Sequence, residues 1–164
     1  DDTVYATTVD LMRRDPFFYK NQAMQEYGLQ KITLERGIAG NTSYALSYLF
    51  EKIEDYLGIN RNNYYYTYGW SGLLSTQQRQ QDAIRFYQEL SAEVAKFHAQ
   101  GLHPRIHIVA YSHGGNVCLN LAYAQQLCGD IPALTIDELV LVGMPVQQDT
   151  DYFVNDPMFK RVYN

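Results

Sequence analysis

Short β-rich runs alternate with helical spacing along most of the chain. The β-rich runs cover residues 31–35, 64–68, 105–110 and 139–142. Between them, apolar residues recur every three or four positions, which predicts helices over about 46–57, 76–100 and 114–127. This alternation is typical of βαβ units, so we predict an α/β fold, with a mainly parallel sheet and helices on both faces. The first thirty residues have helical spacing with a break at Asp15-Pro16.

Composition narrows the class of protein. The chain has 164 residues, 46% hydrophobic and 19% charged, with a net charge of −5. These values predict a single folded domain over residues 1–164 rather than a disordered chain. The acidic balance argues against a surface for nucleic acid, which needs a basic patch. No apolar run approaches the roughly 20 residues that span a bilayer, and no signal peptide is visible, so the compartment stays open.

The cysteines do not form the framework of a disulfide-rich or metal-binding protein. Cys118 and Cys128 lie in or just after one predicted helix, too far apart along it for a disulfide. We therefore predict two buried thiols. We expect neither a metal ion nor an organic cofactor.

One segment has the pattern of a catalytic turn. Residues 110–115 (Ala-Tyr-Ser-His-Gly-Gly) stand between a β run and a predicted helix. A strand that turns directly into a helix holds a serine at its apex in a strained backbone conformation, and the residues two before and two after it must be small. Ala110 and Gly114 meet both demands. The pattern predicts Ser112 as a nucleophile, with the His113 backbone N–H aimed at developing negative charge, against the alternative that Ser112 only caps the helix.

This turn resembles that of the α/β-hydrolase superfamily, and within it the lipase and esterase branch, which carries Gly/Ala-x-Ser-x-Gly-Gly after the fifth strand. Residues 68–72 (Tyr-Gly-Trp-Ser-Gly) look like the family's loop after the fourth strand. Residues 142–146 (Val-Gly-Met-Pro-Val) look like its Gly-Thr-Pro loop after the sixth. The resemblance covers about Lys31 to Asn164 in the family's order and spacing.

Another loop is similar to the family's oxyanion loop, His-Gly-x-x-Gly. Gly37 and Gly40 match that pattern, while Arg36 stands where the family usually has His. The resemblance implies that the backbone N–H of Ile38 is the second oxyanion donor, beside that of His113. Because this donor belongs to the backbone, it does not need the histidine.

Other candidate residues have plainer interpretations. Ser71 is a second serine in a Gly-x-Ser-Gly context, but the bulky Leu73 follows it and no helix starts there. Asn41-Thr42-Ser43 is formally an N-glycosylation sequon, and we interpret it as a helix cap.

The histidines also have structural interpretations. His98 and His103 flank a predicted helix end, where polar or cationic side chains are expected. His107 lies inside a predicted buried strand, and we interpret it as a hydrogen-bonded core histidine.

A serine nucleophile needs a base and an acid that orients the base. The resemblance places the acid after the seventh strand and the histidine after the eighth, yet all four histidines lie at or before residue 113. Asp149 and Asp151 follow the sixth predicted strand, an alternative acid position in some lipases. A strand that begins at 160–164 would be the seventh. We therefore expect the base and acid beyond residue 164, and the sheet edge near Val162 open or covered by other sequence.

The predicted function is a serine hydrolase that cleaves apolar or lipid carboxylic esters, as in lipid metabolism, through an acyl-enzyme on Ser112. The alternative is a non-catalytic α/β-hydrolase-like binding or interaction module. The expected partner is a small-molecule or lipid ester. The sequence leaves the acyl length, the head group and the oligomeric state open.

Overall fold

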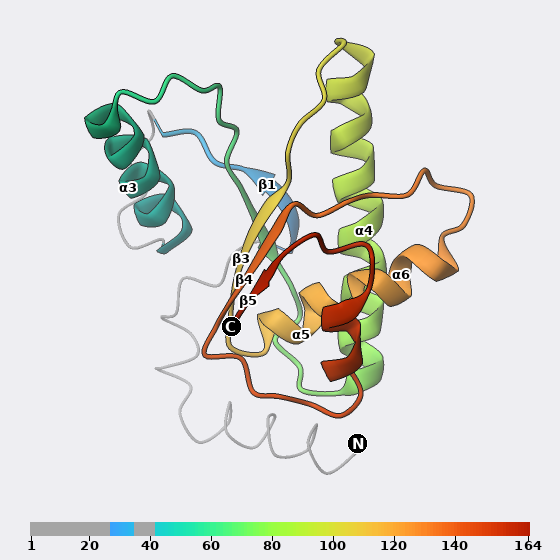
Figure 1. Ribbon diagram of the computed structural model, residues 1–164. Coiled ribbons are helices and arrows are strands. Elements are labelled where there is room, and N and C mark those ends of the chain that lie inside the picture. Colours follow the sequence, from blue (N-terminus) through green and yellow to red (C-terminus); the bar gives the residue numbers. More distant parts are fainter. Residues whose placement is uncertain (1–26, 35–41) are drawn as a thin grey trace. The chain divides into compact units, whose positions relative to one another are not determined.

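The computed structural model describes residues 27–34 and 42–164 (Figure 1). The chain forms two compact units, Asp15–Gly69 and a larger one that includes Trp70–Asn164, and each is described by itself. The expected helical start of the chain, the Arg36–Asn41 loop and the Asn41 sequon lie outside the described residues.

The smaller unit contains an antiparallel strand pair and one helix. Strand β1 (Gly28–Lys31) pairs with β2 (Tyr66–Gly69), and the Ile32 N–H donates to the Tyr65 carbonyl at 2.8 Å just beyond the pair. The prediction of a strand over 31–35 was therefore wrong by about three residues. The pair is also antiparallel, so its strands do not belong to a parallel sheet as we expected.

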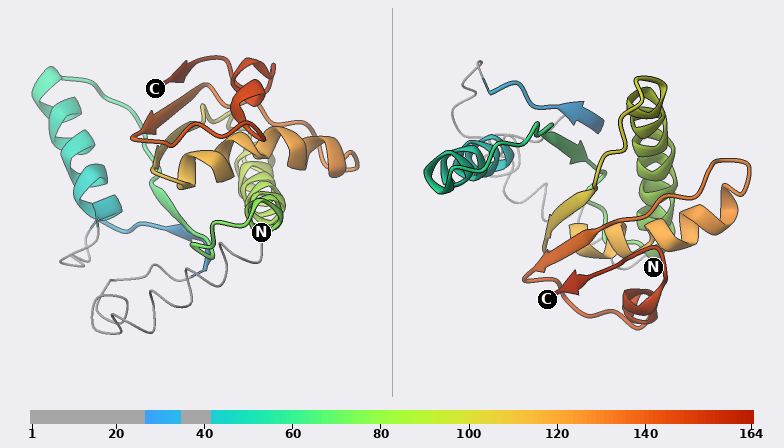
Figure 2. Two further views of the ribbon diagram at one scale, coloured as in Figure 1. Left: turned by 90° about the horizontal axis from the view of Figure 1, so that it is seen from below. Right: turned by 45° about the horizontal axis from the view of Figure 1, so that its top comes forward.

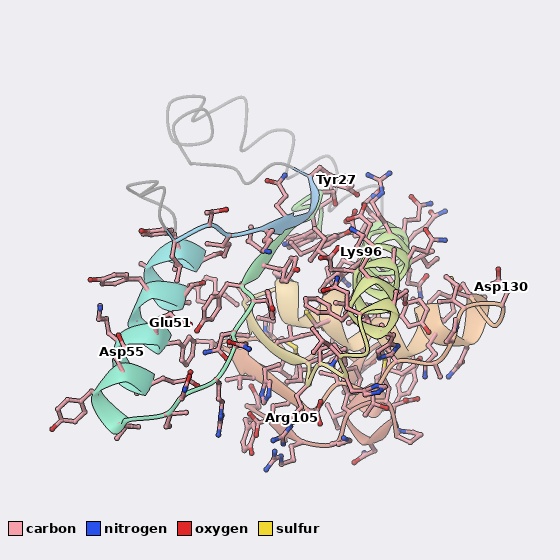
Figure 3. All side chains as sticks on the ribbon, turned by 90° about the horizontal axis from the view of Figure 1, so that it is seen from above. Tyr27, Glu51, Asp55, Lys96, Arg105 and Asp130 are labelled. Atoms are coloured by element: carbon pink, nitrogen blue, oxygen red, sulfur yellow. The ribbon has the colours of Figure 1, made fainter. Side chains whose placement is uncertain are left out.

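Helix α3 (Thr42–Leu57) occupies the segment where the apolar stripe predicts a helix. The stripe is exposed, however: the side chains are 40–60% accessible at Leu46, Leu49, Phe50, Ile53 and Leu57. Only Ser47 is buried on this helix. Figure 3 labels Glu51 and Asp55, one turn apart on α3, and Glu51 accepts a hydrogen bond from the Asn63 side chain at 3.2 Å.

The larger unit is an α/β structure built on a three-stranded parallel sheet in the order β3-β4-β5. The strands are β3 (His107–Tyr111), β4 (Glu138–Val142) and β5 (Val162–Tyr163), and Ala110 stands opposite Leu141 in the register. The strands predicted at 105–110, 139–142 and 160–164 are thus confirmed. A short 3-10 helix, η1 (Asp151–Asn155), lies between β4 and β5.

Three helices pack on one face of this sheet: α4 (Thr76–Ala99), α5 (Gly114–Leu119) and α6 (Leu121–Leu127) (Figure 2). Buried side chains from these helices and from the strands form the core, among them Ala83, Tyr87, Leu119, Leu121, Ile136 and Leu139. The opposite face is open at Val109 and Tyr111 of β3 and at Val142 of β4, which are 48%, 77% and 46% exposed. Burial alternates along these strands, so in the described chain helices cover one face of the sheet, and the expected helices on its other face are not seen.

The helix boundaries follow the local sequence closely, with one exception. Helix α4 begins after Ser75, whose hydroxyl accepts from the Gln78 N–H at 3.4 Å, and it ends before Gly101, which has a φ of 74°. The single helix predicted over 114–127 is interrupted at Asn120. The Asn120 side chain donates to the Asn116 carbonyl at 2.8 Å, the same acceptor that its own N–H uses at 3.2 Å, and side-chain bonds of this kind compete with the helical pattern.

The two thiols are free and buried, as predicted. Burial raises the pKa of Cys118 to about 12, so this thiol stays protonated and inert at neutral pH. Among the described residues, no helix has the length and apolar character needed to cross a bilayer.

Candidate active site

Ser112 lies at the turn between the last residue of β3 and the first turn of α5. Its φ is 51°, the left-handed conformation that the sequence pattern predicts for this position. Within residues 27–34 and 42–164 it is the only non-glycine residue with a positive φ. The Ser112 N–H donates to the Val142 carbonyl at 2.9 Å, which anchors the turn to the neighbouring strand. The structure therefore has a strand–serine–helix turn at the carboxyl end of the sheet.

The small residues around Ser112 have different steric neighbours. Ala110 is buried, at 6% exposed, so a larger side chain there would have to fit into the core. A Cβ built on Gly114 would lie 3.8 Å from the Trp70 Nε1, an ordinary contact, and would not meet the strand as we expected. A Cβ on Gly115 would lie 2.6 Å from the Met144 Sδ and 3.1 Å from the Leu141 Cδ2. The close approach to the strand thus falls on the second glycine rather than the first.

Several polar groups at this turn have no hydrogen-bond partner among the residues that the structure describes. They are the Ser112 hydroxyl and the backbone N–H groups of His113 and Gly114. The next N–H along the chain, that of Gly115, donates to the Ser112 carbonyl at 3.0 Å. Unpaired donors beside a hydroxyl are the arrangement that an oxyanion requires.

The His113 imidazole lies beside the nucleophile candidate without contacting it. Its Nδ1 is buried and has no hydrogen-bond partner in the described part of the chain. Burial lowers the pKa of His113, and the charge of Arg79 lowers it further. The ring is therefore neutral at pH 7.

Arg79 of α4 is a buried cation that holds the loop after β4. Its side chain is 2% exposed, and its guanidinium donates to the Leu74 carbonyl at 2.7 Å and to the Gln147 side chain. It also forms an ion pair with Asp149, with 3.5 Å between Nη2 and Oδ2. The Asp149 carboxylate therefore faces an arginine, whereas an orienting acid would face a histidine. Asp151 is exposed in the first turn of η1.

A second contact network joins α5 to the same loop. The Asn116 side chain is fully buried and donates to the Pro145 carbonyl at 3.1 Å, while the Thr150 hydroxyl donates to the Asn116 Oδ1 at 2.5 Å. The loop after β4 is thus bonded both to Arg79 of α4 and to Asn116 of α5, and these contacts fix its position relative to the serine turn.

The other three histidines lie away from Ser112. His98 and His103 pack on each other at the end of α4, with 5.2 Å between ring centroids. The His107 Nδ1 lies 2.8 Å from the Glu138 Oε2, and its side chain is 48% exposed. The prediction of a core position for His107 was wrong, because its side chain projects from the open face of the sheet. In the described chain, no histidine nitrogen is hydrogen-bonded to the Ser112 hydroxyl.

Ser71 is engaged elsewhere. Its hydroxyl donates to the Asp82 Oδ2 at 2.5 Å, and its N–H donates to the same oxygen at 3.3 Å. Asp82 is fully buried. Arg79, Asp82 and the Trp70 side chain were not among the residues predicted for the site. A signal was present, because Arg79 and Asp82 stand on the same helical stripe as the buried Ala83, Phe86 and Tyr87.

The proposed donor Ile38 lies in residues 35–41, outside the described residues. The described side chains include no group of three or more His, Cys, Asp or Glu that could hold a metal ion.

Comparison of the chain with protein-family models, with characterised proteins and with solved structures finds no significant match.

Proposed function

We propose that this protein is a serine hydrolase of the α/β-hydrolase type, which cleaves carboxylic esters through an acyl-enzyme on Ser112. The proposal is carried by the φ of 51° at Ser112, in a turn that joins a parallel strand to a helix. A non-glycine residue in this region costs on the order of 1–3 kcal/mol and persists where the fold requires it, often at functional sites. A helix cap does not need this strain, because cap residues adopt extended backbone.

The proposed reaction has two halves. The Ser112 Oγ attacks the ester carbonyl carbon while a general base takes its proton, and the carbonyl oxygen becomes an oxyanion that accepts from the His113 N–H. The bond to the alcohol oxygen then breaks, and the base returns the proton to that oxygen. Water hydrolyses the acyl-enzyme by the same route.

The base and its acid are assigned to sequence outside these 164 residues, because the four histidines do not contact the Ser112 hydroxyl. In the proposed enzyme the second oxyanion donor is the Ile38 N–H, and the complete sheet is wider and has helices on both faces. The open face at Val109 and Val142 is then covered.

An apolar ester is the substrate class that the surroundings of Ser112 favour. Tyr111 directly precedes the serine and is 77% exposed, and Val142, whose carbonyl holds the Ser112 N–H, is 46% exposed. The Tyr111 ring lies near Gly143, 4.0 Å from the position of a Cβ there. Exposed apolar side chains next to a nucleophile favour an acyl chain over a peptide.

A fluorophosphonate probe on the natural full-length protein tests the assignment. We expect covalent labelling at Ser112, found by peptide mass spectrometry, and its complete loss in Ser112→Ala. Ser75→Ala is the matched control: it removes the cap of α4, at a cost of about 1 kcal/mol, and should keep the label. Turnover of p-nitrophenyl esters should follow the same pattern.

Three results contradict the proposal. Labelling at Ser71, or labelling that survives Ser112→Ala, shows that the nucleophile is elsewhere. A folded natural chain with neither labelling nor ester turnover favours the non-catalytic module. Equal or better turnover of peptide amides argues against an esterase.

A further inference from the structure

The indole of Trp70 lies against the serine turn. Its Nε1 stands 3.8 Å from the position that a Cβ on Gly114 would occupy, two residues after the nucleophile candidate. Within the described chain this N–H has no hydrogen-bond partner, and the side chain is half-buried. An indole N–H is a donor only, and it finds an acceptor when it is desolvated. A ligand that covers the turn would have to supply that acceptor.

A buried carboxylate fixes the loop that carries Trp70. Asp82 on α4 accepts both the hydroxyl and the N–H of Ser71, the next residue along the chain. The Ser71 Oγ in turn accepts from the Leu73 N–H at 3.3 Å. Gly72, between Ser71 and Leu73, has a φ of 71°, a left-handed conformation that makes a tight turn of the loop. The backbone that carries the indole is thus fixed on its C-terminal side, and the indole itself is half-buried.

This arrangement offers an explanation for the glycine at position 114. A Cβ there would not collide with the strand, so sterics alone do not require glycine. It would instead cover the Trp70 N–H on the side of the serine turn. The glycine leaves this donor uncovered, next to the unpaired N–H groups of His113 and Gly114.

We propose that the Trp70 indole N–H is a side-chain donor to the oxyanion formed from an ester at Ser112, held in place by Ser71 and Asp82. This inference rests on the proposed hydrolase function. Trp70 would then touch the reacting oxygen, whereas Ser71 and Asp82 would be positioning residues. Removing one oxyanion donor typically lowers kcat by about a hundredfold or more, with little change in KM.

The test replaces the N–H and nothing else. In the natural full-length protein, amber suppression at position 70 introduces 3-benzothienylalanine, which keeps the shape of the indole and puts sulfur in place of N–H. We expect kcat for p-nitrophenyl butyrate to fall by about a hundredfold or more, with KM within about threefold. Trp70→Phe should show the same fall. Asp82→Asn, which weakens the Ser71 contact, should give a smaller fall in kcat.

The outcomes separate the two proposals. If Ser112→Ala abolishes turnover while the benzothienyl variant, folded and with an unchanged Tm, keeps its kcat within twofold, the role of Trp70 is wrong and the hydrolase stands. If only KM rises, Trp70 binds the substrate without stabilising the oxyanion, which also overturns the inference. If the natural chain is inactive towards every ester, both proposals fail.

Discussion

Charged side chains are paired at the end of the parallel sheet where the strands begin. At the end where β3 and β4 finish, several polar groups have no partner among the described residues. We call the first the paired end: it consists of Arg105, His107, Asp137, Glu138, Lys160 and Arg161. The Asp137 carboxylate accepts hydrogen bonds from the Lys160 ammonium at 2.7 Å and from the Ile106 N–H at 3.0 Å. The Glu138 carboxylate forms an ion pair with the Arg161 guanidinium at 2.7 Å.

We call the second the elbow end: Trp70, Ser112, His113 and Gly114. Here the Ser112 hydroxyl, the Trp70 N–H and the His113 Nδ1 have no partner among the described residues. An unpaired polar group costs stability where it is buried, as the His113 Nδ1 is, whereas Ser112 and Trp70 are only half-buried. Charged side chains therefore join the strands at one end of this sheet, whereas the other end, with its unpaired polar groups, is where we propose that the reaction takes place.

The strongest test of the paired end is Asp137→Ala. Hydrogen bonds to a charged group contribute roughly 1.5–3 kcal/mol each, so we expect the free energy of unfolding to fall by about 2–4 kcal/mol. Ester turnover per folded molecule should stay within twofold. Urea denaturation measures the first quantity and an activity assay the second.

Asp130→Ala is the matched control, because Asp130 projects into solvent from the turn after α6 (Figure 3). It should change the free energy of unfolding by less than about 0.5 kcal/mol. Equal effects of the two alanine variants would show that the paired end does not stabilise the sheet.

The same carboxylate makes stability depend on pH. Burial raises the pKa of Asp137, but hydrogen bonds from Lys160 and the Ile106 N–H, and the charges of Lys160 and Arg105, outweigh burial and lower it overall. Its contribution is therefore fully present above the unfolded pKa of about 3.9 and is lost as pH falls through the lower folded value. Unfolding curves of Lys160→Met between pH 5 and pH 2 should show less of this loss than the wild type.

The elbow end is tested by two adjacent glycines. Gly115→Ala pushes a Cβ into Met144 and Leu141, so we expect a loss of about 1–2 kcal/mol in the free energy of unfolding. Gly114→Ala meets only the Trp70 indole, and it should be neutral in stability while lowering kcat. If Gly114→Ala is the more destabilising variant, the close contact of the turn has been misplaced.

Low pH should also lower the free energy of unfolding through protonation of His113. Burial and the charge of Arg79 lower its folded pKa, so the unfolded chain binds this proton first. Stability should therefore fall as pH drops below about 6.5, the unperturbed value for histidine. His113→Gln removes this slope, and thermal melts at pH 5 and pH 7.5 compare the two proteins. An unchanged slope would mean that His113 protonates as easily in the folded chain.

The smallest effect is expected at the exposed pair of the paired end. His107 and Glu138 lie 2.8 Å apart, yet they are 48% and 28% exposed. His107→Ala should change the free energy of unfolding by no more than about 0.5 kcal/mol. A loss near that of Asp137→Ala would show that this ion pair is coupled to the core.

The candidate nucleophile could be predicted because its determinants are local. Ser112 stands between a β run and a helical period, and both elements formed where the spacing placed them. The cap at Ser75 and the stop at Gly101 likewise set α4 to within a residue. Such features depend on backbone conformations and side-chain hydrogen bonds within a few positions of one another.

The partners of these residues were not local, and tertiary structure decided them. Ser71 is hydrogen-bonded to Asp82, eleven residues away, and Arg79 to Asp149, seventy residues away. Strand β1 pairs antiparallel with β2, although a helix separates them in the chain. Periodicity reports which face of an element is apolar, but it does not report what covers that face, so the open side of the sheet could not be foreseen. Local sequence was enough to place the elements of the larger unit and the serine turn. Only the tertiary structure decided which buried polar groups meet, because those contacts join positions whose separation in the chain carries no information about their distance in space.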